Sequence, residues 1–161
     1  MLTTIQSLPD SSRIWIFPAD RKLTASESSE LLALIDAYLA NWKAHEVPVQ
    51  AARDLRYDQF LVIAADPQVT APSGCSIDDL TRAIKALSAK FGVDFFSALK
   101  VFYKEGDEVR VASRSGFKST ANPDTIVFDN SITTLGALRA GKWELPASES
   151  WHKALLNLIP A

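Results

Sequence analysis

The stretch ALKVFYKEGDEVRVAS (98–113) contains two short segments with alternating apolar side chains, separated by Gly106. Such alternation is typical of strands with one buried face, and a glycine between two such segments is typical of a tight hairpin turn. We therefore predict an antiparallel pair of strands here. Because the predicted strands come partly in hairpins and do not alternate regularly with helices, we predict an α+β fold. It would be a single domain with a mainly antiparallel sheet and three or four helices packed on it.

Other strands are predicted from runs of β-branched and aromatic residues. These runs are RIWIFP (13–18), QFLVIAAD (59–66) and DTIVFDNSI (124–132). The run at 59–66 is apolar without a break, which favours a central strand buried on both faces. Residues 47–57 are compatible with a strand or with a mixed connection. Residues 1–12 are polar and rich in turn formers, so we expect a loose lead-in before a domain at 13–161.

Helices are predicted from capping signals that precede apolar residues at helical spacing. TASE (24–27) is a capping box, and the apolar face that follows it extends through Trp42 to His45. SIDD (76–79) is a second capping box, and Gly92 is placed to end that helix. A short helix is predicted at 133–141. Ser148 would cap a last helix containing Trp151, Leu155 and Leu158 or Ile159.

Composition excludes several classes of function. The 161 residues carry a net charge of −2, and no run of Lys and Arg offers a site for a nucleic acid or an anionic membrane. The apolar runs are too short for a transmembrane helix, which needs about 20 residues. The first ten residues lack the pattern of a signal peptide, and the single cysteine cannot form an internal disulfide. We expect a soluble cytoplasmic protein of bacterial type.

One segment partly matches a nucleotide-binding motif. GALRAGKW (136–143) has the glycine and lysine spacing of a phosphate-binding loop, but Trp143 stands where a Ser or Thr must bind magnesium. Ala137–Ala140 favour a helix over a flexible loop, and Pro146 interrupts the helix that should follow. We interpret Gly141 as the end of a short helix and predict that the protein is not an ATPase.

Neither a metal site nor a cofactor is predicted. The sequence has no Cys-x-x-Cys and no histidine pair at helical spacing. A zinc site would need Cys75, His45, His152 and one carboxylate to converge from three segments, and nothing in their spacing indicates that they do.

Cys75 is the strongest candidate for chemistry. It lies in APSGCSIDDL (71–80), directly before the predicted helix, where the helix dipole stabilises a thiolate. Asp78 and Asp79 in the first predicted turn would oppose that stabilisation by a similar amount. The alternative is that Cys75 is a small, inert residue in a tight corner.

Two histidines could serve Cys75 as a general base. His45 is predicted at a helix C-terminus, where bonds to the last carbonyl groups would explain it without catalysis. His152 follows Trp151 in the first turn of the predicted last helix, and Asp129 and Asn130 could orient it. The four tryptophans (Trp15, Trp42, Trp143 and Trp151) are expected mostly in the core, and two in a cleft would suit a flat or aliphatic ligand.

WKAH (42–45), SGCSID (73–78) and SWHKAL (150–155), together with RIWIF near the start, resemble a family of small bacterial proteins. Its members are often labelled "ABC transporter ATPase". The resemblance covers about Arg13–Leu156 and implies no particular activity. It implies instead that one site groups the residues at the recurring motif positions, which are Trp42, His45, Ser73, Gly74, Cys75, Ser76, Asp78, Asn130, Trp151 and His152.

Two hypotheses about function follow. In the first, the protein is a non-catalytic domain that binds a small molecule or a protein partner, and a homodimer is compatible with this role. The residues expected to contact the ligand are Trp42, Ser73, Ser76, Asp78, Asn130 and Trp151. In the second, it is a thiol-dependent hydrolase or transferase with Cys75 as nucleophile and His152 or His45 as base. The lack of a complete catalytic signature favours the first hypothesis.

Overall fold

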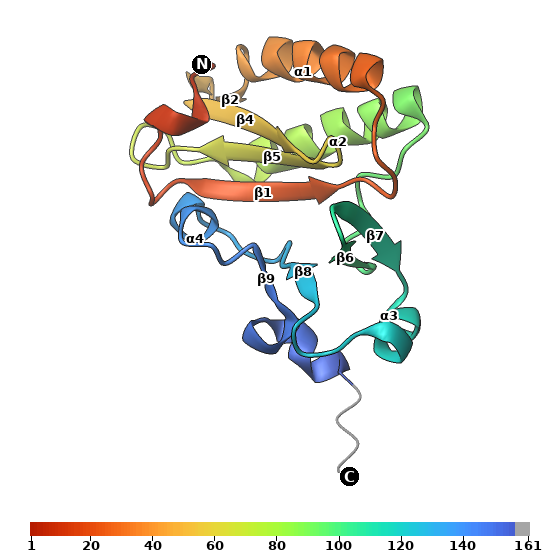
Figure 1. Ribbon diagram of the computed structural model, residues 1–161. Helices are drawn as coiled ribbons and strands as arrows, with labels where there is room; N and C mark the ends of the chain where they lie inside the picture. The colour runs from red at the N-terminus through yellow and green to blue at the C-terminus, as the bar shows by residue number, and fades with distance from the viewer. Residues whose placement is uncertain (157–161) are drawn as a thin grey trace. The chain divides into compact units, whose positions relative to one another are not determined.

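The computed structural model describes residues 1–156, which fold into two compact units (Figure 1). Unit 1 comprises Met1–Ser97 and Thr133–Gly136, and unit 2 comprises Ala98–Ile132 and the described residues from Ala137 to Leu156. The chain therefore leaves unit 1 at Ser97, folds most of unit 2, and returns briefly to unit 1.

The centre of unit 1 is a three-stranded antiparallel sheet. Its strands lie in the order β1 (Arg13–Pro18), β5 (Phe60–Ala65) and β4 (Ala51–Arg56). All six residues of β5 are buried, which confirms the prediction of a central strand with two covered faces. Residues 47–57, for which a strand and a mixed connection were both compatible with the sequence, contain β4 and a short strand β3 (Val47–Pro48). Strand β3 pairs with β2 (Lys43–Ala44).

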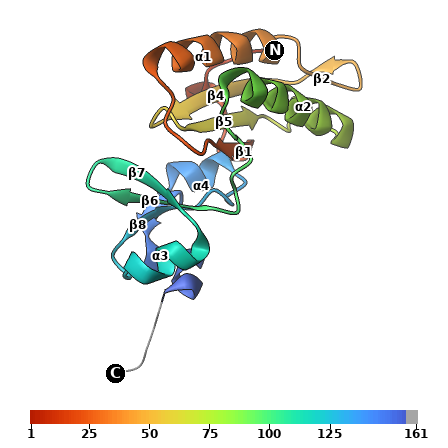
Figure 2. The same ribbon diagram turned by 90° about the vertical axis from the view of Figure 1, so that its right-hand side faces the viewer.

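Two helices pack on one face of this sheet. Helix α1 (Ala25–Leu39) and helix α2 (Gly74–Phe91) lie on the same side of the strands (Figure 2). Their buried side chains form one core with alternate residues of β5; this core includes Leu31, Ile35, Leu39, Leu80, Ile84, Leu61, Ile63 and Ala65. The amphipathic patterns of the two helices therefore correspond to a real shared interior.

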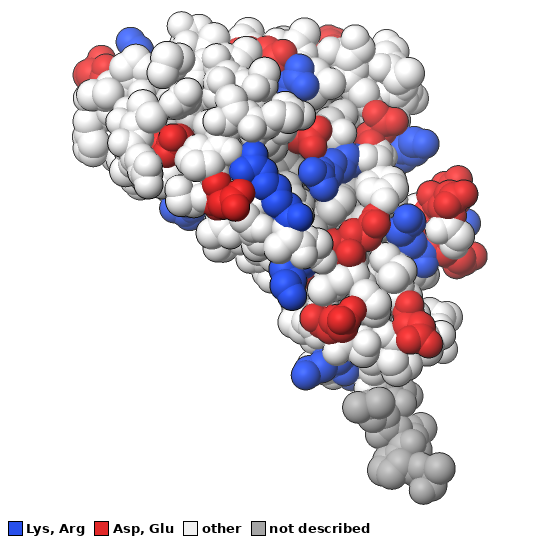
Figure 3. Space-filling view, turned by 60° about the vertical axis from the view of Figure 1, so that its left-hand side comes forward, with Lys and Arg blue, Asp and Glu red and all other residues white. Residues whose placement is uncertain are grey.

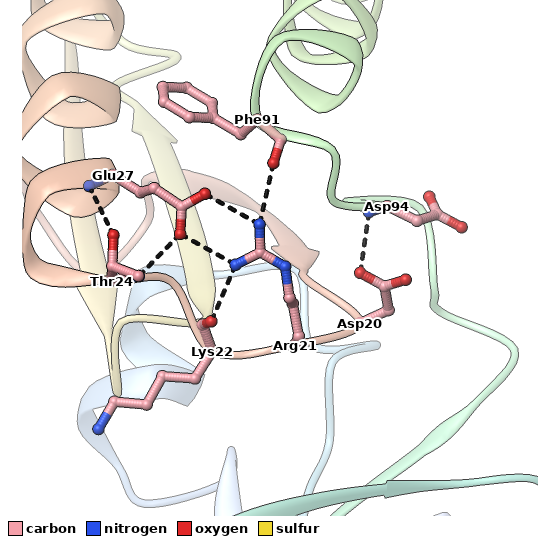
Figure 4. A network of polar contacts seen from close by, with 7 residues as sticks. All are labelled: Asp20, Arg21, Lys22, Thr24, Glu27, Phe91 and Asp94. Atoms are coloured by element: carbon pink, nitrogen blue, oxygen red, sulfur yellow. Dashed lines mark hydrogen bonds and ion pairs between the residues drawn. The ribbon is translucent and has the colours of Figure 1, made fainter.

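The start of α1 is held by a network that also reaches the end of α2 (Figure 4). The hydroxyl of Thr24 accepts from the backbone of Glu27, and the Glu27 carboxylate accepts from the backbone of Thr24, as the capping box predicts. Arg21 donates to both oxygens of that carboxylate and to the carbonyl oxygen of Phe91. Because of the bonds from Arg21 and then Thr24, the pKa of Glu27 is lowered to about 2.

The first twelve residues are more ordered than the expected loose lead-in. The ammonium group of Met1 donates to the carbonyl oxygens of Leu39 and Val49, and Leu2 forms a parallel bridge with Ala51. A short 3₁₀ helix follows at Ile5–Ser7. Backbone hydrogen bonds to the edge strand β4 hold this segment. Such bonds do not depend on the side chains, so the composition of the segment could not predict them.

Unit 2 is built on a second antiparallel sheet. Its strands lie in the order β7 (Glu108–Ala112), β6 (Val101–Glu105), β8 (Ile126–Phe128) and β9 (Glu144–Pro146). The hairpin of β6 and β7 is confirmed, with Glu105 opposite Glu108 and Gly106 at a φ of 62° in the turn. The core of unit 2 contains Val101, Phe117, Val127, Leu145 and Ala147.

Short helices complete the described chain. Helix α3 (Arg114–Thr120) follows β7, and α4 (Leu135–Arg139) ends before Gly141, which has a φ of 77° and is confirmed as a helix-terminating glycine. The predicted last helix is instead two 3₁₀ helices, η2 (Ala147–Glu149) and η3 (Trp151–Leu155). Ser150 caps η3, so Ser148 as the cap was wrong. The predicted apolar positions Leu158 and Ile159 lie outside the described residues.

The predicted α+β class with antiparallel strands is confirmed, and α1–α4 match the expected number of helices within residues 1–156. The strands form three sheets where one was expected. No helix in the described part of the chain combines the length and apolar character needed to cross a membrane.

Candidate functional site

The residues singled out from the sequence divide between the two units. Trp42, His45, Ser73, Gly74, Cys75, Ser76 and Asp78 belong to unit 1, whereas Asn130, Trp151 and His152 belong to unit 2. Within unit 1 the structure joins Trp42 to Ser76, because the buried indole nitrogen donates to the Ser76 carbonyl oxygen over 2.9 Å. A pairing of Cys75 with His152 would cross from one unit to the other and stays a prediction.

Helix α2 begins earlier than the sequence suggested. Its N-cap is Ser73, whose hydroxyl accepts from the backbone of Ser76, so the predicted capping box at Ser76 and Asp79 was wrong. Cys75 consequently lies within the first turn, where it is exposed. The first turn contains no acidic residue, because Asp78 and Asp79 fall beyond it. Asp79 instead accepts a hydrogen bond from the hydroxyl of Tyr38.

His45 is not at a helix C-terminus. Helix α1 ends at Leu39, and His45 and Glu46 form the two-residue turn between β2 and β3, with φ angles of 51° and 67°. Two positive φ angles are typical of a tight hairpin turn, which usually has Asn or Gly at these positions. The helical explanation of His45 was therefore wrong, and the usual sequence signal for this turn is absent.

A cavity of about 360 Å³ lies in unit 2. This volume is at the lower end of the range for small-molecule sites, roughly 300–1,000 Å³. Its lining residues are Ala98, Lys100, Arg114, Phe128, Asn130, Ser131, Trp151 and His152. Three of the candidates from the sequence, Asn130, Trp151 and His152, thus share one cavity.

Strand pairing explains why these segments meet. Lys100 directly precedes β6 and Arg114 directly follows Ser113 after β7, and Val101 is paired with Ala112 in that hairpin. Strand β8 is antiparallel to β6, so Asn130, which follows β8, comes to the same end of the sheet. The cavity therefore lies where three strand ends converge.

The orientation of Asn130 is fixed by a tryptophan. The indole nitrogen of Trp143 donates to the Asn130 side-chain oxygen over 2.9 Å. An indole N–H can only donate, so the atom facing it must be the amide oxygen and not the amide nitrogen. The amide NH₂ is therefore the end of Asn130 that remains for a ligand.

His152 is oriented in a similar way by Ser150. The Ser150 hydroxyl accepts the backbone N–H of His152 and lies 2.7 Å from Nδ1 of its imidazole. The hydroxyl proton can be donated to Nδ1, which places the hydrogen of the neutral ring on Nε2. Burial lowers the pKa of His152 to about 4, with Asp129 acting in the opposite direction, so the ring is neutral at pH 7.

Two cations complete the lining. The guanidinium carbon of Arg114 lies 5.3 Å from the centroid of the Trp151 ring, and Trp151 stacks on His152 with centroids 3.9 Å apart. No ion pair joins Lys100 or Arg114 to a carboxylate anywhere in residues 1–156. The cavity lining itself contains no acidic residue.

Sequence reasoning missed five of the lining residues: Ala98, Lys100, Arg114, Phe128 and Ser131. A signal for the two cations was present, because the predicted hairpin around Gly106 places residues 100 and 113 opposite one another. Nothing local marked Ser131, whose hydroxyl donates to Asp129.

A second cavity, of about 420 Å³, lies in unit 1 and is lined by Leu2, Thr3, Thr4, Ile5, Gln6, Asp36, Arg53 and Asp54. Its central charges already neutralise one another, because Arg53 donates to both oxygens of Asp36. This cavity therefore offers a ligand less unpaired charge than the cavity in unit 2.

No group of three or more His, Cys, Asp and Glu residues within the described range could hold a metal ion. Of the four tryptophans, Trp42 and Trp143 are buried as expected, whereas Trp151 is 37% exposed at the edge of the cavity. Comparison of the chain with models of protein families, with curated proteins and with solved structures found no match in any of the three.

Proposed function

We propose that this protein is a small, non-catalytic ligand-binding domain, and that its ligand occupies the cavity in unit 2. The observation that carries the proposal is the convergence of oriented polar groups and apolar surface on one cavity of about 360 Å³. Phe128, Ala98 and the ring of Trp151 offer an apolar wall, while Asn130 and His152 offer polar atoms in set orientations. Cavities of this composition are the usual binding sites for small molecules.

The cavity lacks the parts expected of a hydrolytic site. Ser131 is the one hydroxyl-bearing residue in its lining, and that hydroxyl donates to Asp129 and not to an imidazole. Ser150 does contact His152, but it serves as the cap of η3 and does not line the cavity. These contacts support a binding role over nucleophilic catalysis at this site.

The surface charge supports a small-molecule ligand over a nucleic acid. On the face shown in Figure 3, the described acidic and basic side chains are interspersed. Binding to a nucleic-acid backbone depends on a concentration of Lys and Arg. We also propose a cytoplasmic setting, in which an exposed free thiol such as that of Cys75 stays reduced.

A fragment screen followed by ¹H–¹⁵N NMR tests the proposal. We expect at least one fragment to shift the indole signal of Trp151 and the side-chain amide signals of Asn130 in a saturable way; Trp151→Phe would assign the indole signal. Ala98→Phe should block the cavity and abolish these shifts. Leu99→Phe introduces the same side chain at the neighbouring position, which does not line the cavity, and should leave binding intact. Shifts that persist unchanged in Ala98→Phe would contradict the proposal.

A thiol-dependent enzyme is the second candidate. One observation favours it: Cys75 is exposed in the first turn of α2, and that turn carries no acidic residue. The positive end of a long helix stabilises a thiolate, which is the reactive form of cysteine. This candidate needs His45 or His152 as base, and the labelling experiment in the Discussion separates it from the first.

A further inference from the structure

Four polar side chains of the cavity in unit 2 can present a hydrogen-bond donor: Lys100, Arg114, Asn130 and His152. The exception is Ser131, whose hydroxyl already donates to Asp129. Lys100 and Arg114 are donors by their chemistry. Asn130 could present a donor or an acceptor, but the protein engages its acceptor atom. For His152, the tautomer in which Ser150 donates to Nδ1 leaves Nε2–H as a donor. Trp143 donates to the Asn130 oxygen, and Ser150 lies 2.7 Å from Nδ1 of His152.

The side chains that line the cavity also carry a net positive charge. Two cationic side chains line the cavity, and no carboxylate lines it. Asp129 raises the pKa of His152, and its carboxylate accepts from the backbone and hydroxyl of Ser131. Lys100 and Arg114 therefore bring positive charge to a concave, partly apolar surface without an acidic partner within residues 1–156.

We infer that the ligand of this cavity is a small organic oxyanion, with a carboxylate or phosphate group held by Lys100, Arg114 and Asn130 and a compact apolar body against Phe128 and Trp151. This inference rests on the proposed function and specifies the class of ligand. Bonds from charged donors to an oxyanion are stronger than bonds between neutral groups, and a planar guanidinium matches the two oxygens of such an anion. A neutral ligand of the same shape would offer these two cations no charged acceptor.

A set of probes that share one ring tests the charge requirement. Benzoate and phenyl phosphate are the anionic probes, benzamide is the neutral isostere of benzoate, and benzylamine is the cationic counterpart. Affinities are measured by NMR titration of the Trp151 and Asn130 signals. We expect each anion to bind about a hundredfold more tightly than benzamide, because Lys100 and Arg114 would each add a charged hydrogen bond worth about tenfold. Benzylamine should bind more weakly than benzamide. The ratio of benzoate to phenyl phosphate affinity distinguishes a carboxylate site from a phosphate site.

Charge-removing variants test which residues hold the anion. Lys100→Gln and Arg114→Gln should each weaken benzoate binding by about tenfold and leave benzamide binding within about twofold. Lys118→Gln removes a positive charge from the same helix as Arg114 without touching the cavity lining, so it should change neither affinity. Thermal unfolding of each variant would confirm that the fold is retained. Both residues are exposed and have no carboxylate partner within residues 1–156, so little stability should be lost.

The two proposals fail in different ways. If benzamide and benzoate bind in the cavity with equal affinity, the oxyanion inference is wrong and the proposed function stands. Equal weakening of benzoate binding by Lys118→Gln and Arg114→Gln would also overturn the inference, because the effect would then be general electrostatics. If no probe and no screened fragment shifts the cavity signals, both proposals are wrong.

Discussion

The indole nitrogen of Trp143 donates a hydrogen bond over 2.9 Å to the side-chain oxygen of Asn130. Trp143 is buried, and its ring also packs on Phe128 with centroids 4.8 Å apart. The tryptophan therefore belongs to the packing that supports the cavity, while the asparagine it orients lines the cavity. Through this contact, the interior of unit 2 determines which atoms the proposed site presents.

Asn130→Asp should separate the structural role of this contact from the binding role. An aspartate keeps an oxygen for Trp143, so the free energy of unfolding at pH 7 should fall by less than about 1 kcal/mol. It also removes the NH₂ donor and adds a negative charge, so benzoate affinity should fall by about tenfold or more while benzamide affinity changes little. Denaturant unfolding and NMR titration give the two quantities. A large loss of stability with unchanged benzoate affinity would contradict the assigned orientation.

The buried imidazole of His152 should make stability depend on pH. Burial lowers its pKa from 6.5 to about 4, so between these values the unfolded chain binds more protons than the folded one. Stability should therefore fall as the pH is lowered from about 7 to 4, by at most on the order of 3 kcal/mol from this group. Urea unfolding of the wild type and of His152→Gln should show a smaller pH dependence in the variant. The ring signals of His152, assigned with His45→Gln, should titrate near pH 4.

The N-cap of α2 can be tested by substituting Ser73. Ser73→Ala removes the hydroxyl that accepts from the Ser76 backbone and should destabilise the protein by about 1 kcal/mol. Ser73→Asp keeps an acceptor and adds a negative charge at the positive end of the helix, so its stability should match or exceed that of the wild type. Chemical unfolding of the pair is the measurement. Equal destabilisation by both substitutions would indicate that the helix begins elsewhere.

The Arg21–Glu27 contact predicts a second dependence on pH, in an acidic range. The pKa of Glu27 is lowered from 4.5 to about 2 by its bonds to Arg21 and Thr24, so its contribution is present above pH 4.5 and is lost as the pH falls toward 2. Glu27→Gln should therefore be less stable than the wild type at pH 6, and the difference should shrink toward pH 2. Glu30→Gln, in the same helix, is the control. A difference that stays constant with pH would argue against the ion pair as its source.

Labelling of Cys75 with iodoacetamide distinguishes the two candidate functions. Because the thiol is exposed in α2, we expect it to react in the native protein without unfolding. The binding-domain proposal predicts the same rate in the wild type, His45→Ala and His152→Ala. The thiol-enzyme candidate instead predicts fast labelling at pH 6 that slows sharply in one histidine variant, which would identify the base.

Features that depend on neighbouring residues could be predicted from the sequence. The capping box at Thr24, the end of α2 at Gly92, the hairpin turn at Gly106 and the buried run of β5 all follow from local chemistry. Local signals were less reliable where two nearby residues could both act as the N-cap of a helix. Ser73 and Ser76 are both good N-cap residues, and the cap was assigned to the wrong one.

The tertiary structure decided which residues form a site. Asn130, Trp151 and His152 meet Lys100 and Arg114 because β8 pairs with β6 and β6 pairs with β7, and these pairings join residues distant in sequence. The donor character of the cavity also depends on packing between separate segments, since an asparagine alone can donate or accept. The contact of Ser150 with His152 is local, but Trp143 engages the amide oxygen of Asn130 from another segment, and a linear sequence does not specify hydrogen-bond partners across a fold.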